Sequence, residues 1–424
     1  EKRQLADLKE IVKFAYENAP YYKRSFDEAG VKPEDIKELS DIQKFPFINK
    51  KTQRDTQGVG SFLGELCAVP EEDVVFISTS SGSTGVPTMS PFTKKDFDEF
   101  QDTESRWFWQ IGMRPNDRYV HALNFSLYVG GPDVIGAQNL GALCIWGGTL
   151  PSERLLFILK TYQPTIIWTS PSYAWQLGEK ALKAGIDPKK DLNIKKIIVA
   201  GELGGSIDAT RKAIEDLWGA EVYDFYGLSD IFGACAAMCE AKDGLHIAEN
   251  HILVETVDIH TGEVLKPGEV GELVFTTLRK QARPLIRFRT GDIGWIDNTP
   301  CKCGRTHGRI HINGRKDDMF IVSAVNVFPS DIEAVIREQK DITGEYLIRV
   351  FEKDFTCKYS VEIEKKIDNP DTDEEVAAKV SAALKARIGV KPYTVVVHPD
   401  GGLDTRSEHK SRRIIDERKL DYSI

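Results

Sequence analysis

The sequence predicts an α/β protein with a large N-terminal domain, in which helices flank a sheet, and a small C-terminal α/β domain. Three observations support this fold class. Between residues 74 and about 275, short apolar runs of strand length alternate with amphipathic helical patterns, which is typical of a largely buried sheet covered by helices. After a charged stretch at residues 314–318 the alternation restarts on a smaller scale. A chain of 424 residues is also too long for one compact core, so two or more domains are expected.

The elements of the large domain follow one another in a regular order. Residues 1–70 carry apolar side chains at helical spacing near their start and then become irregular, so we expect helices that pack against the rest of the protein. The strand-like runs that follow are residues 74–77, 119–123, 142–146, 165–168 and 197–200. Helical patterns lie between them, for example at residues 154–162 and 207–218. Ligands of such sheets bind beyond the carboxyl ends of the strands, so we expect the site there.

The C-terminal part has the elements of a compact α/β unit. Residues 330–333 read Ser-Asp-Ile-Glu, the form of a capping box, so a helix is expected to begin there. Strands are predicted at residues 346–351, 359–363 and 394–398, and a helix at about residues 372–386. We therefore expect a large domain of residues 1–316 and a small, mobile domain of residues 317–424, a normal domain size, with a hinge at Asp317.

Composition and charge exclude several classes of protein. The chain has 56 basic and 65 acidic residues and a formal net charge of −9, which argues against a surface for nucleic acids or acidic membranes. It contains no apolar run of about eighteen residues, so no membrane span is predicted. Seven cysteines, odd in number and clustered, indicate a reducing compartment rather than a disulfide framework, and the expected location is cytoplasmic. The sequence leaves open whether the chain forms a homodimer.

A hydroxyl-rich loop at residues 79–88 is the first functional signal. It reads Thr-Ser-Ser-Gly-Ser-Thr-Gly-Val-Pro-Thr and follows an apolar run. Because its glycines leave room, backbone N–H groups and hydroxyls can approach phosphate oxygens. It is not a Walker loop, since no Lys-Ser or Lys-Thr pair follows the second glycine, and by itself such a cluster commonly marks an ordinary turn. The candidate phosphate-binding residues are Ser80, Ser81, Gly82, Ser83, Thr84 and Gly85.

Four further motifs follow the loop along the chain. Residues 223–230 read Tyr-Asp-Phe-Tyr-Gly-Leu-Ser-Asp, and residues 287–292 read Arg-Phe-Arg-Thr-Gly-Asp, whose carboxylate suits both hydroxyls of a ribose. Residues 314–318 read Gly-Arg-Lys-Asp-Asp at the domain break, and residues 406–412 place Lys410 on a polar tail. Each motif alone is weak, because a surface lysine is usually solvated and an Asp after Gly usually marks a turn. Their order is far more specific than any one of them.

In this order the motifs resemble the adenylate-forming superfamily of acyl-CoA synthetases, peptide-synthetase adenylation domains and luciferases. Within it, four segments resemble the phenylacetate-CoA ligase branch, and the resemblance covers essentially the whole chain. These segments are Tyr21-Tyr22-Lys23, Ile42-Gln43-Lys44-Phe45-Pro46-Phe47, Cys301-Lys302-Cys303-Gly304-Arg305-Thr306 and Val325-Asn326-Val327-Phe328-Pro329. The implied cofactors are ATP, Mg²⁺ and coenzyme A as co-substrate.

The resemblance implies a reaction in two halves. A carboxylate attacks the α-phosphate of ATP to give an acyl-adenylate and pyrophosphate, and the thiol of coenzyme A then displaces AMP. The resemblance places the pyrophosphate end of ATP at residues 79–88 and the ribose at Asp292 and Arg315. The residues that it places around adenine are Gly201, Glu202, Asp224, Phe225, Tyr226 and Gly227. No nucleophile from the protein is expected, since such chemistry needs mostly positioning and charge neutralisation.

Two charged residues take part in the implied chemistry. Asp230 stands where the family usually has Glu, which helps to bind Mg²⁺, and Asp still offers a hard oxygen ligand. Lys410 is the late lysine, which the resemblance brings to the acyl carboxylate and the phosphate when the small domain rotates about Asp317. In the second half-reaction the small domain turns away.

The acid is expected to bind at residues 124–131, where the family has an aromatic and glycine-bearing segment. The candidate substrate-binding residues are Phe125, Tyr128, Gly130 and Gly131. An ordinary core role for Phe125 has equal weight, because buried aromatic side chains are mostly packing. This segment does not name the acid.

The chain departs from the family pattern at three further positions. Val86 replaces the usual lysine of the phosphate loop, and His409 replaces the glycine before the late lysine. Ala324 stands where a glycine usually lines the pantetheine tunnel, so an extra methyl group enters that tunnel.

The cysteines support a separate hypothesis of a structural zinc site. Cys301 and Cys303 lie in a Pro-Cys-Lys-Cys-Gly turn, while Cys239 and His246 flank another turn. Three sulfurs and one imidazole form a complete tetrahedral Zn²⁺ set. Cys235 and His307 are substitutes in this hypothesis, and the alternative is that the cysteines are small buried hydrophobes or free thiols.

The sequence therefore predicts an ATP- and Mg²⁺-dependent carboxylate–CoA ligase that acts through an acyl-adenylate. Aryl acids, arylacetic acids such as phenylacetate, and small branched acids all fit as substrates. One alternative is an adenylating enzyme with another acceptor, such as a carrier protein or a deazaflavin cofactor. A second is a nucleotide-binding sensor of the same fold, against which the retention of Lys410, Asp292 and Arg315 argues. Basic patches interleaved with aromatic residues are absent, so nucleic-acid binding is a poor third.

Overall fold

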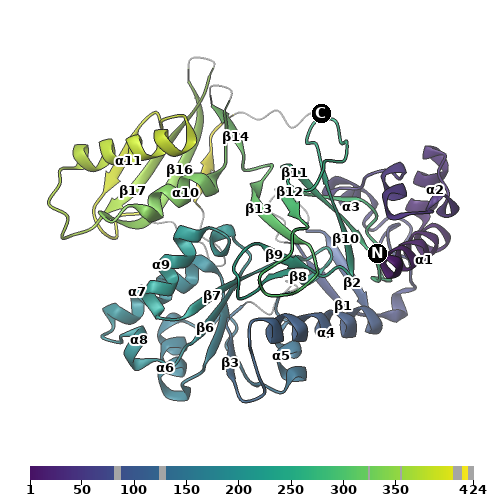
Figure 1. Ribbon diagram of the computed structural model, residues 1–424, viewed down its shortest axis with the longest axis horizontal. Helices are drawn as coiled ribbons and strands as arrows, with labels where there is room; N and C mark the ends of the chain where they lie inside the picture. Colours follow the sequence, from purple (N-terminus) through teal and green to yellow (C-terminus); the bar gives the residue numbers. More distant parts are fainter. Residues whose placement is uncertain (81–86, 124–129, 323–324, 354–355, 404–412, 419–424) are drawn as a thin grey trace.

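A central sheet with helices on its faces and a separate C-terminal lobe make up the protein (Figure 1). The computed structural model describes the chain except residues 81–86, 124–129, 323–324, 354–355, 404–412 and 419–424. The predicted α/β class, with a large sheet domain and a smaller C-terminal α/β domain, is confirmed. None of the helices in the described ranges is long and apolar enough to cross a membrane.

The large sheet has eleven strands within the described residues. In spatial order they are β10 (Ile252–Val257), β11 (Gly271–Thr277), β12 (Phe288–Asp297), β13 (Arg309–Arg315), β9 (Leu245–Ile247), β8 (Phe232–Met238), β7 (Glu221–Leu228), β6 (Lys196–Ala200), β5 (Ile166–Thr169), β3 (Arg118–His121) and β4 (Leu143–Trp146). The five strands from β3 to β7 pair in parallel, and the pairs from β7 to β10 are antiparallel. The carboxyl ends of the parallel strands therefore meet at one edge.

Helices cover both faces of the parallel strands, as the alternating pattern predicted. The helices of the large domain are α1 (Lys2–Asn18), α2 (Pro20–Ala29), α3 (Lys50–Thr56), α4 (Lys94–Gln110), α5 (Val134–Leu140), α6 (Ser152–Tyr162), α7 (Pro171–Lys183), α8 (Pro188–Asp191) and α9 (Asp208–Trp218). Tyr119 of β3 enters the core shared with α4 and α5, whereas its neighbour Val120 enters the core shared with α6, α7 and α9. Successive side chains of a strand point to opposite faces, so one short strand supplies both cores.

The hydroxyl-rich loop joins two strands rather than a strand and a helix. β1 (Val74–Thr79) and β2 (Met89–Thr93) form a separate antiparallel pair, and residues 80–88 connect them. This differs from a Walker loop, as the sequence predicted, because a Walker loop runs into a helix. Thr93 then caps α4, since its side chain accepts a hydrogen bond from the backbone N–H of Asp96.

In its described residues, the C-terminal lobe has a four-stranded sheet, two helices and a hydrophobic core of its own. Its sheet has the order β18 (Val395–His398), β17 (Thr356–Lys365), β16 (Ile342–Lys353) and β19 (Ile414–Asp416), and its helices are α10 (Pro329–Glu338) and α11 (Asp373–Ile388). A short pair, β14 (Phe320–Val322) and β15 (Val325–Val327), precedes them. Phe320 is the first residue of this core, and the predicted hinge Asp317 lies between β13 and β14.

The predicted capping box at residues 330–333 is wrong. α10 begins at Pro329, and Phe328 occupies the position before the helix without a side-chain cap. Ser330 lies inside the first turn, where its hydroxyl donates a hydrogen bond to the carbonyl oxygen of Asn313 instead. Proline starts the helix because its missing N–H is one that a first turn leaves unpaired, and its fixed φ is already helical.

Candidate active site

The two residues predicted to hold the ribose lie together on neighbouring strands, next to Tyr226, which was predicted beside the adenine. Asp292 in β12 and Arg315 in β13 are direct partners in the antiparallel register. Nη1 of Arg315 donates a 3.0 Å hydrogen bond to Oδ1 of Asp292, and the Tyr226 hydroxyl of β7 donates to the other oxygen. Burial raises the pKa of Asp292, although Arg315 opposes the shift. A carboxylate braced on both oxygens still has free lone pairs for two further hydroxyl donors.

The residues predicted around adenine follow the carboxyl end of β6 and lie on β7. Gly201 has φ +83°, a left-handed conformation that favours glycine and lets the chain turn sharply after β6. Glu202 then accepts hydrogen bonds from the hydroxyl and the backbone N–H of Ser172, at 2.8 and 3.1 Å. Asp224 accepts one from Ser206, and burial raises the pKa of Asp224 to about 7. The predicted residues therefore come together at one edge of the sheet.

The two ends of the phosphate loop are tied to each other. The backbone N–H of Ser80 donates to the carbonyl oxygen of Thr88 at 3.1 Å, and the Thr88 hydroxyl donates to the Ser80 hydroxyl at 3.0 Å. These bonds join the two ends of the loop, and the Thr88 hydroxyl also lies 3.4 Å from Oδ1 of Asp230. Ser81, Gly82, Ser83, Thr84, Gly85 and Val86 lie outside the described residues.

Asp230, the candidate magnesium ligand, is buried among cations. Lys50 at the start of α3 forms an ion pair with it, and Nζ of Lys50 also donates a 3.2 Å hydrogen bond to the Thr88 hydroxyl. Nη2 of Arg283 lies 3.6 Å from Oδ1 of Asp230. Burial by itself would raise the pKa of Asp230, but Lys50 and Arg283 hold it below its usual value. The carboxylate is therefore ionised and close to the loop that is expected to meet phosphate.

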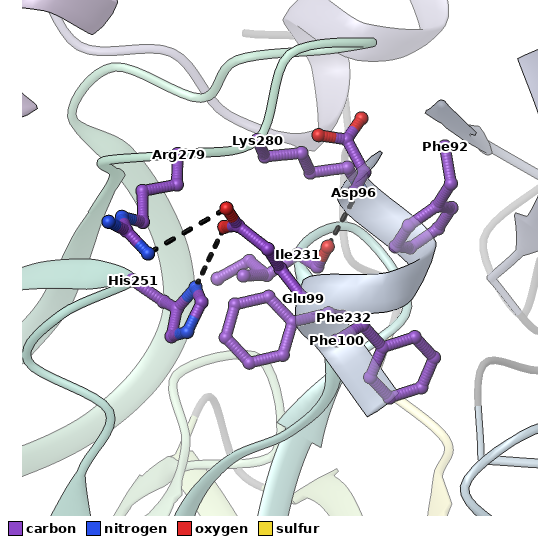
Figure 2. Close-up of a pocket in the computed structure, with 9 residues that line it drawn as sticks. All are labelled: Phe92, Asp96, Glu99, Phe100, Ile231, Phe232, His251, Arg279 and Lys280. Carbon is purple, nitrogen blue, oxygen red and sulfur yellow. Dashed lines mark hydrogen bonds and ion pairs between the residues drawn. The ribbon is translucent and has the colours of Figure 1, made fainter. Parts of the chain in front are cut away.

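A buried lysine fixes the turn that carries Asp230. Lys280 is only 5% exposed, and its ammonium donates hydrogen bonds to the carbonyl oxygens of Asp230 and Ile231 and to the Ser90 hydroxyl. It also lies 3.8 Å from the centre of the Phe92 ring. Figure 2 shows the small pocket that it borders, lined by Phe92, Asp96, Glu99, Phe100, Ile231, Phe232, His251, Arg279 and Lys280. The polar side chains that border this pocket already bond to one another, to the turn or to nearby backbone, so we assign it no role in substrate binding.

The candidate acyl-binding segment is described only at its end. Phe125 and Tyr128 lie outside the described residues, whereas Gly130 and Gly131 are placed. Nε2 of His121 hydrogen-bonds to the Gly130 carbonyl at 2.9 Å, so Nε2 carries the proton and Nδ1 accepts from the Tyr119 hydroxyl. Burial lowers the pKa of His121 to about 3, so the imidazole is neutral. His121 thus anchors one end of the segment to β3.

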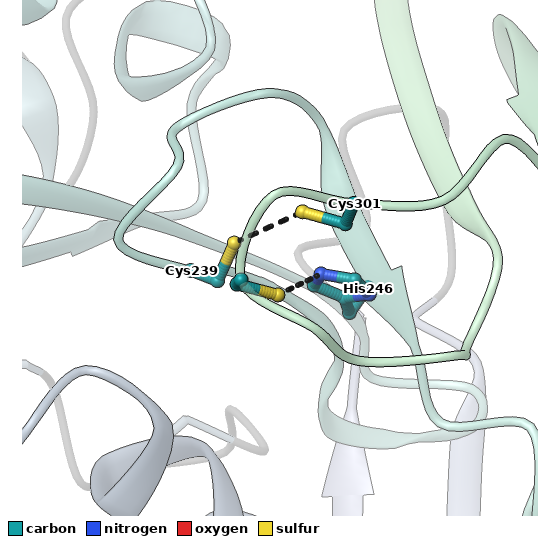
Figure 3. A group of neighbouring side chains, drawn as sticks. Cys239, His246 and Cys301 are labelled. Carbon is teal, nitrogen blue, oxygen red and sulfur yellow. Dashed lines mark hydrogen bonds between the residues drawn. The ribbon is translucent and has the colours of Figure 1, made fainter.

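The four predicted zinc ligands form one cluster. Their ligand atoms all lie within 4.8 Å of one another, and Figure 3 shows Cys239, His246 and Cys301 pointing toward one another. Sγ of Cys239 is 3.7 Å from Sγ of Cys301, and Sγ of Cys303 is 3.3 Å from Nε2 of His246. The pairing of β9 with β13 places His246 beside the loop that carries Cys301 and Cys303.

The two substitute ligands do not belong to this cluster. His307 uses its carbonyl oxygen, which accepts a 3.1 Å hydrogen bond from Nδ1 of His246 and so leaves Nε2 free to face the sulfurs. Cys235 lies within β8, where its thiol faces the carbonyl oxygen of Tyr226. Cys235 is part of the large hydrophobic core, whereas Cys239 follows the end of β8.

Two family models match the chain. The model described as "AMP-binding enzyme" matches residues 12–278, and the one described as "AMP-binding enzyme C-terminal domain" matches residues 324–418.

The chain belongs to the AMP-binding enzyme family. Curated relatives agree over nearly the full length. The phenylacetate-coenzyme A ligase of Thermus thermophilus is 35% identical over 97% of this chain and 95% of its own. That of Aromatoleum evansii is 36% identical over 98% of this chain and 94% of its own, and that of Escherichia coli is 35% identical over the same shares. The predicted enzyme class, an acid–thiol ligase, is confirmed for this AMP-binding enzyme.

Solved structures of 2-hydroxyisobutyryl-CoA ligase share the fold of this AMP-binding enzyme. The postadenylation state of that protein, in complex with 2-HIB-AMP, superposes with a TM-score of 0.92 at 28% identity, covering 98% of this chain and 89% of that one. Its thioesterification state, with 2-HIB-AMP and CoA, gives a TM-score of 0.73 at 29% identity, covering 99% and 90%.

Sequence reasoning missed three cations of the site in this AMP-binding enzyme. Lys50, Lys280 and Arg283 meet Asp230 and its turn from α3 and from the segment after β11. No local pattern marks Lys50, which lies 180 residues from its partner. The sequence did carry one indication of such a cation: Val86 stands where the family has a lysine, so another positive side chain was needed near the phosphate loop.

Of the residues predicted in and near the small domain, the structure places the hinge candidate but not the late lysine. Lys410 and its neighbour His409 lie outside the described residues, as does Ala324. Asp317 is placed, and its mostly exposed side chain lies 3.5 Å from Nη2 of Arg315. The hinge candidate is thus linked directly to the residue that braces Asp292.

Proposed function

We propose that this AMP-binding enzyme is an ATP-dependent carboxylate–CoA ligase that acts through an acyl-adenylate on an arylacetic acid, an aryl acid or a small branched acid. The observation that carries the proposal is the braced Asp292, which lies at the same sheet edge as the ends of the phosphate loop and Asp230. The near full-length likeness to phenylacetate-coenzyme A ligases supports the choice of acid and of coenzyme A as acceptor. The likeness to a 2-hydroxyisobutyryl-CoA ligase supports the branched acids.

In the first half-reaction the chain holds ATP along the edge of the sheet. Asp292 accepts hydrogen bonds from the ribose hydroxyls, while Arg315 and Tyr226 keep its carboxylate in place. The segments at Gly201 and at residues 224–227 border the adenine, and residues 80–88 receive the pyrophosphate end. Lys50 supplies positive charge at that end, where the loop has Val86.

The residues around Asp230 fit a magnesium ion. Mg²⁺ in such sites is bound through one or two carboxylates together with substrate phosphates, and Asp230 is an ionised carboxylate beside the phosphate loop. When bound, the ion neutralises charge on the triphosphate. Lys280 and Arg283 orient the carboxylate, because they hold its turn and one of its oxygens.

We also propose a structural zinc ion at Cys239, His246, Cys301 and Cys303. Three sulfurs and one imidazole nitrogen fill a tetrahedral shell, so such a site is closed to substrate. The hydrogen bond from His246 to the His307 carbonyl fixes the tautomer that a ligand imidazole needs. The ion would tie the turn after β8 to the connection between β12 and β13.

Between the two half-reactions, we propose that residues 317–424 turn as a small domain about Asp317. Lys410 would then meet the acyl carboxylate and the α-phosphate during adenylation only. An ammonium group there stabilises the negative charge that develops as the carboxylate attacks.

A panel of carboxylic acids scored for pyrophosphate release tests this function. With phenylacetate or a related arylacetate, the enzyme should release pyrophosphate from ATP without coenzyme A. Adding coenzyme A should then produce AMP and the acyl-CoA thioester. A nucleotide-binding sensor would release no pyrophosphate with any acid. An enzyme with a carrier protein or deazaflavin acceptor would form adenylate but no thioester with coenzyme A.

A further inference from the structure

The large domain and the small domain meet on the surfaces of helices. α10 of the small domain packs on α9 of the large domain (Figure 1). Across this contact the Thr210 hydroxyl donates a 3.0 Å hydrogen bond to Oε1 of Glu333. Thr210 is only 2% exposed, so water does not compete freely for the bond. A hydrogen bond from a hydroxyl to a shielded carboxylate is one of the stronger kinds.

Glu333 is held in place from within its own domain. Its second oxygen, Oε2, accepts a 2.9 Å hydrogen bond from the Tyr346 hydroxyl, and Nε of Arg337 lies 3.6 Å from Oε1. Both partners lie in the small domain and would move with Glu333 if that domain turned. The bond from Thr210 is different, because any turn of α10 away from α9 breaks it.

Arg337 makes a second contact across the same interface. Its guanidinium lies 5.4 Å from the centre of the Trp175 ring, which belongs to α7 of the large domain. The side chain is 3% exposed, and its Nε and Nη1 have no hydrogen-bond partner among the described residues. A buried cation with so few partners depends on the aromatic face and the nearby carboxylate. A turn of the small domain would return it to water.

The arrangement of the two domains resembles one state of a relative more than another. The postadenylation state of the 2-hydroxyisobutyryl-CoA ligase superposes with a TM-score of 0.92, and the thioesterification state with 0.73. Each comparison covers at least 98% of this chain, so both domains enter both scores. The contacts of Thr210 and Arg337 therefore belong to an arrangement like the postadenylation one.

We propose that these two contacts form a latch, which holds the small domain in the postadenylation-like arrangement and delays its turn toward thioester formation. Thr210 and Glu333 are positioning residues, since the latch acts through the domain and touches no substrate. The inference rests on the two-arrangement mechanism proposed above and names the residues that set its equilibrium. One hydrogen bond to a charged group is enough to shift a two-state equilibrium roughly ten-fold.

The substitution Thr210→Val tests the latch, because it removes the hydroxyl and keeps a similar volume. Each half-reaction is measured separately, as acid-dependent pyrophosphate release and as thioester formation from supplied acyl-adenylate. The ratio of thioester rate to adenylation rate should rise roughly ten-fold, a factor set by one charged hydrogen bond. Thr210→Ser keeps the hydroxyl, so its ratio of thioester rate to adenylation rate should equal that of the original protein. Glu333→Gln should give a smaller rise, because a neutral amide accepts more weakly.

Small-angle X-ray scattering of the protein without substrates provides a readout independent of activity. Thr210→Val should change the scattering profile toward that of a turned domain, whereas Thr210→Ser should match the original protein. Equal changes in the rates of both half-reactions, together with an unchanged scattering profile, would overturn the latch. If Thr210→Val does not fold, the same measurements on Glu333→Gln test the latch instead. If no acid releases pyrophosphate, the proposed function fails while scattering still decides the latch.

Discussion

At the scale of single residues, Asp292 depends on three strands for its environment. Tyr226 and Arg315 each hold one of its oxygens, and their own positions follow from the order of β7, β12 and β13 in the sheet. The residue type was readable in the Arg-Thr-Gly-Asp motif, but its partners were not. Tyr226 lies 66 residues away and carries no local mark of this contact.

We expect Asp292→Ala to weaken ATP binding more than acid binding. The substitution removes an acceptor for two ribose hydroxyls, and the loss should be about 1.5–3 kcal/mol, the range for hydrogen bonds to charged groups. Calorimetric titration with ATP and with the acid checks this. Unchanged ATP affinity would show that the ribose lies elsewhere.

Lys50→Met should lower ATP affinity by roughly ten-fold, because it removes the cation beside the phosphate loop and leaves Asp230 with the more distant Arg283. AMP affinity should change much less, since AMP lacks the pyrophosphate end. Lys51→Met is the matched control, because Lys51 is the next residue of the same helix and is exposed. Equal losses of ATP and AMP affinity in Lys50→Met would contradict the assignment.

Asp224 should make stability depend on pH. Burial raises its pKa to about 7, whereas an unfolded Asp titrates near pH 4. Between these values the unfolded chain releases the proton and the folded chain keeps it, so stability falls as pH rises through this window. Asp224→Asn, which does not ionise, should lose this dependence. Urea unfolding at pH 5 and pH 8 measures the difference, and Asp216→Asn, at an exposed position on α9, is the control.

At the scale of elements, the zinc cluster shows how strand pairing assembles a site. Cys239 follows β8, His246 lies in β9, and the other two residues come from the connection between β12 and β13, which the β9–β13 pair brings alongside. The Cys-x-Cys turn was visible in the sequence. That it meets Cys239 and His246 depends on a sheet in which β13 pairs with β12 on one side and with β9, from much earlier in the chain, on the other.

We expect about one zinc per chain, which elemental analysis measures. A variant with both Cys301→Ala and Cys303→Ala should lose the metal and melt at a lower temperature, because structural zinc binding is coupled to folding. Cys357→Ala, in the small domain, should change neither property strongly. A metal-free protein that is folded and active would rule out the zinc site.

At the scale of the whole molecule, the proposed turn of the small domain would decide which half-reaction proceeds. We expect Lys410→Ala to slow adenylate formation by about 10²–10³-fold, the cost typical of losing one electrostatic stabiliser. Thioester formation from supplied acyl-adenylate should change little. Asp317→Pro should do the reverse, because a fixed φ at the hinge hinders the turn. If Lys410→Ala ran both half-reactions at the wild-type rate, Lys410 would be an ordinary solvated lysine.

The family, the α/β class and the alternation of strands and helices from β3 to β6 were predictable, because they follow from local patterns, whereas the alternation expected up to residue 275 ends at α9 and gives way to antiparallel strands. Apolar runs of strand length predicted β3, β5 and β6 to within two residues, because strands buried on both faces are mostly apolar. The start of α10 was not predictable, because the Ser330 hydroxyl bonds to the Asn313 carbonyl oxygen of β13 instead of capping the helix. The short strand β19 was missed, since its pairing with β16 is what defines it.

The sequence by itself determined which chemical groups the protein has and in which order: a hydroxyl-rich loop, the acids proposed for the ribose and for a metal, and three thiols with an imidazole. Only the tertiary structure decided which of them meet and what charge surrounds them. Lys50, Arg283 and Lys280 gather at Asp230, and Glu333 meets Thr210 across two domains. The physical reason is that local patterns reflect burial and backbone geometry within a few residues. Contacts between distant residues depend on the order of strands in the sheet and the packing of whole domains, which no local pattern contains.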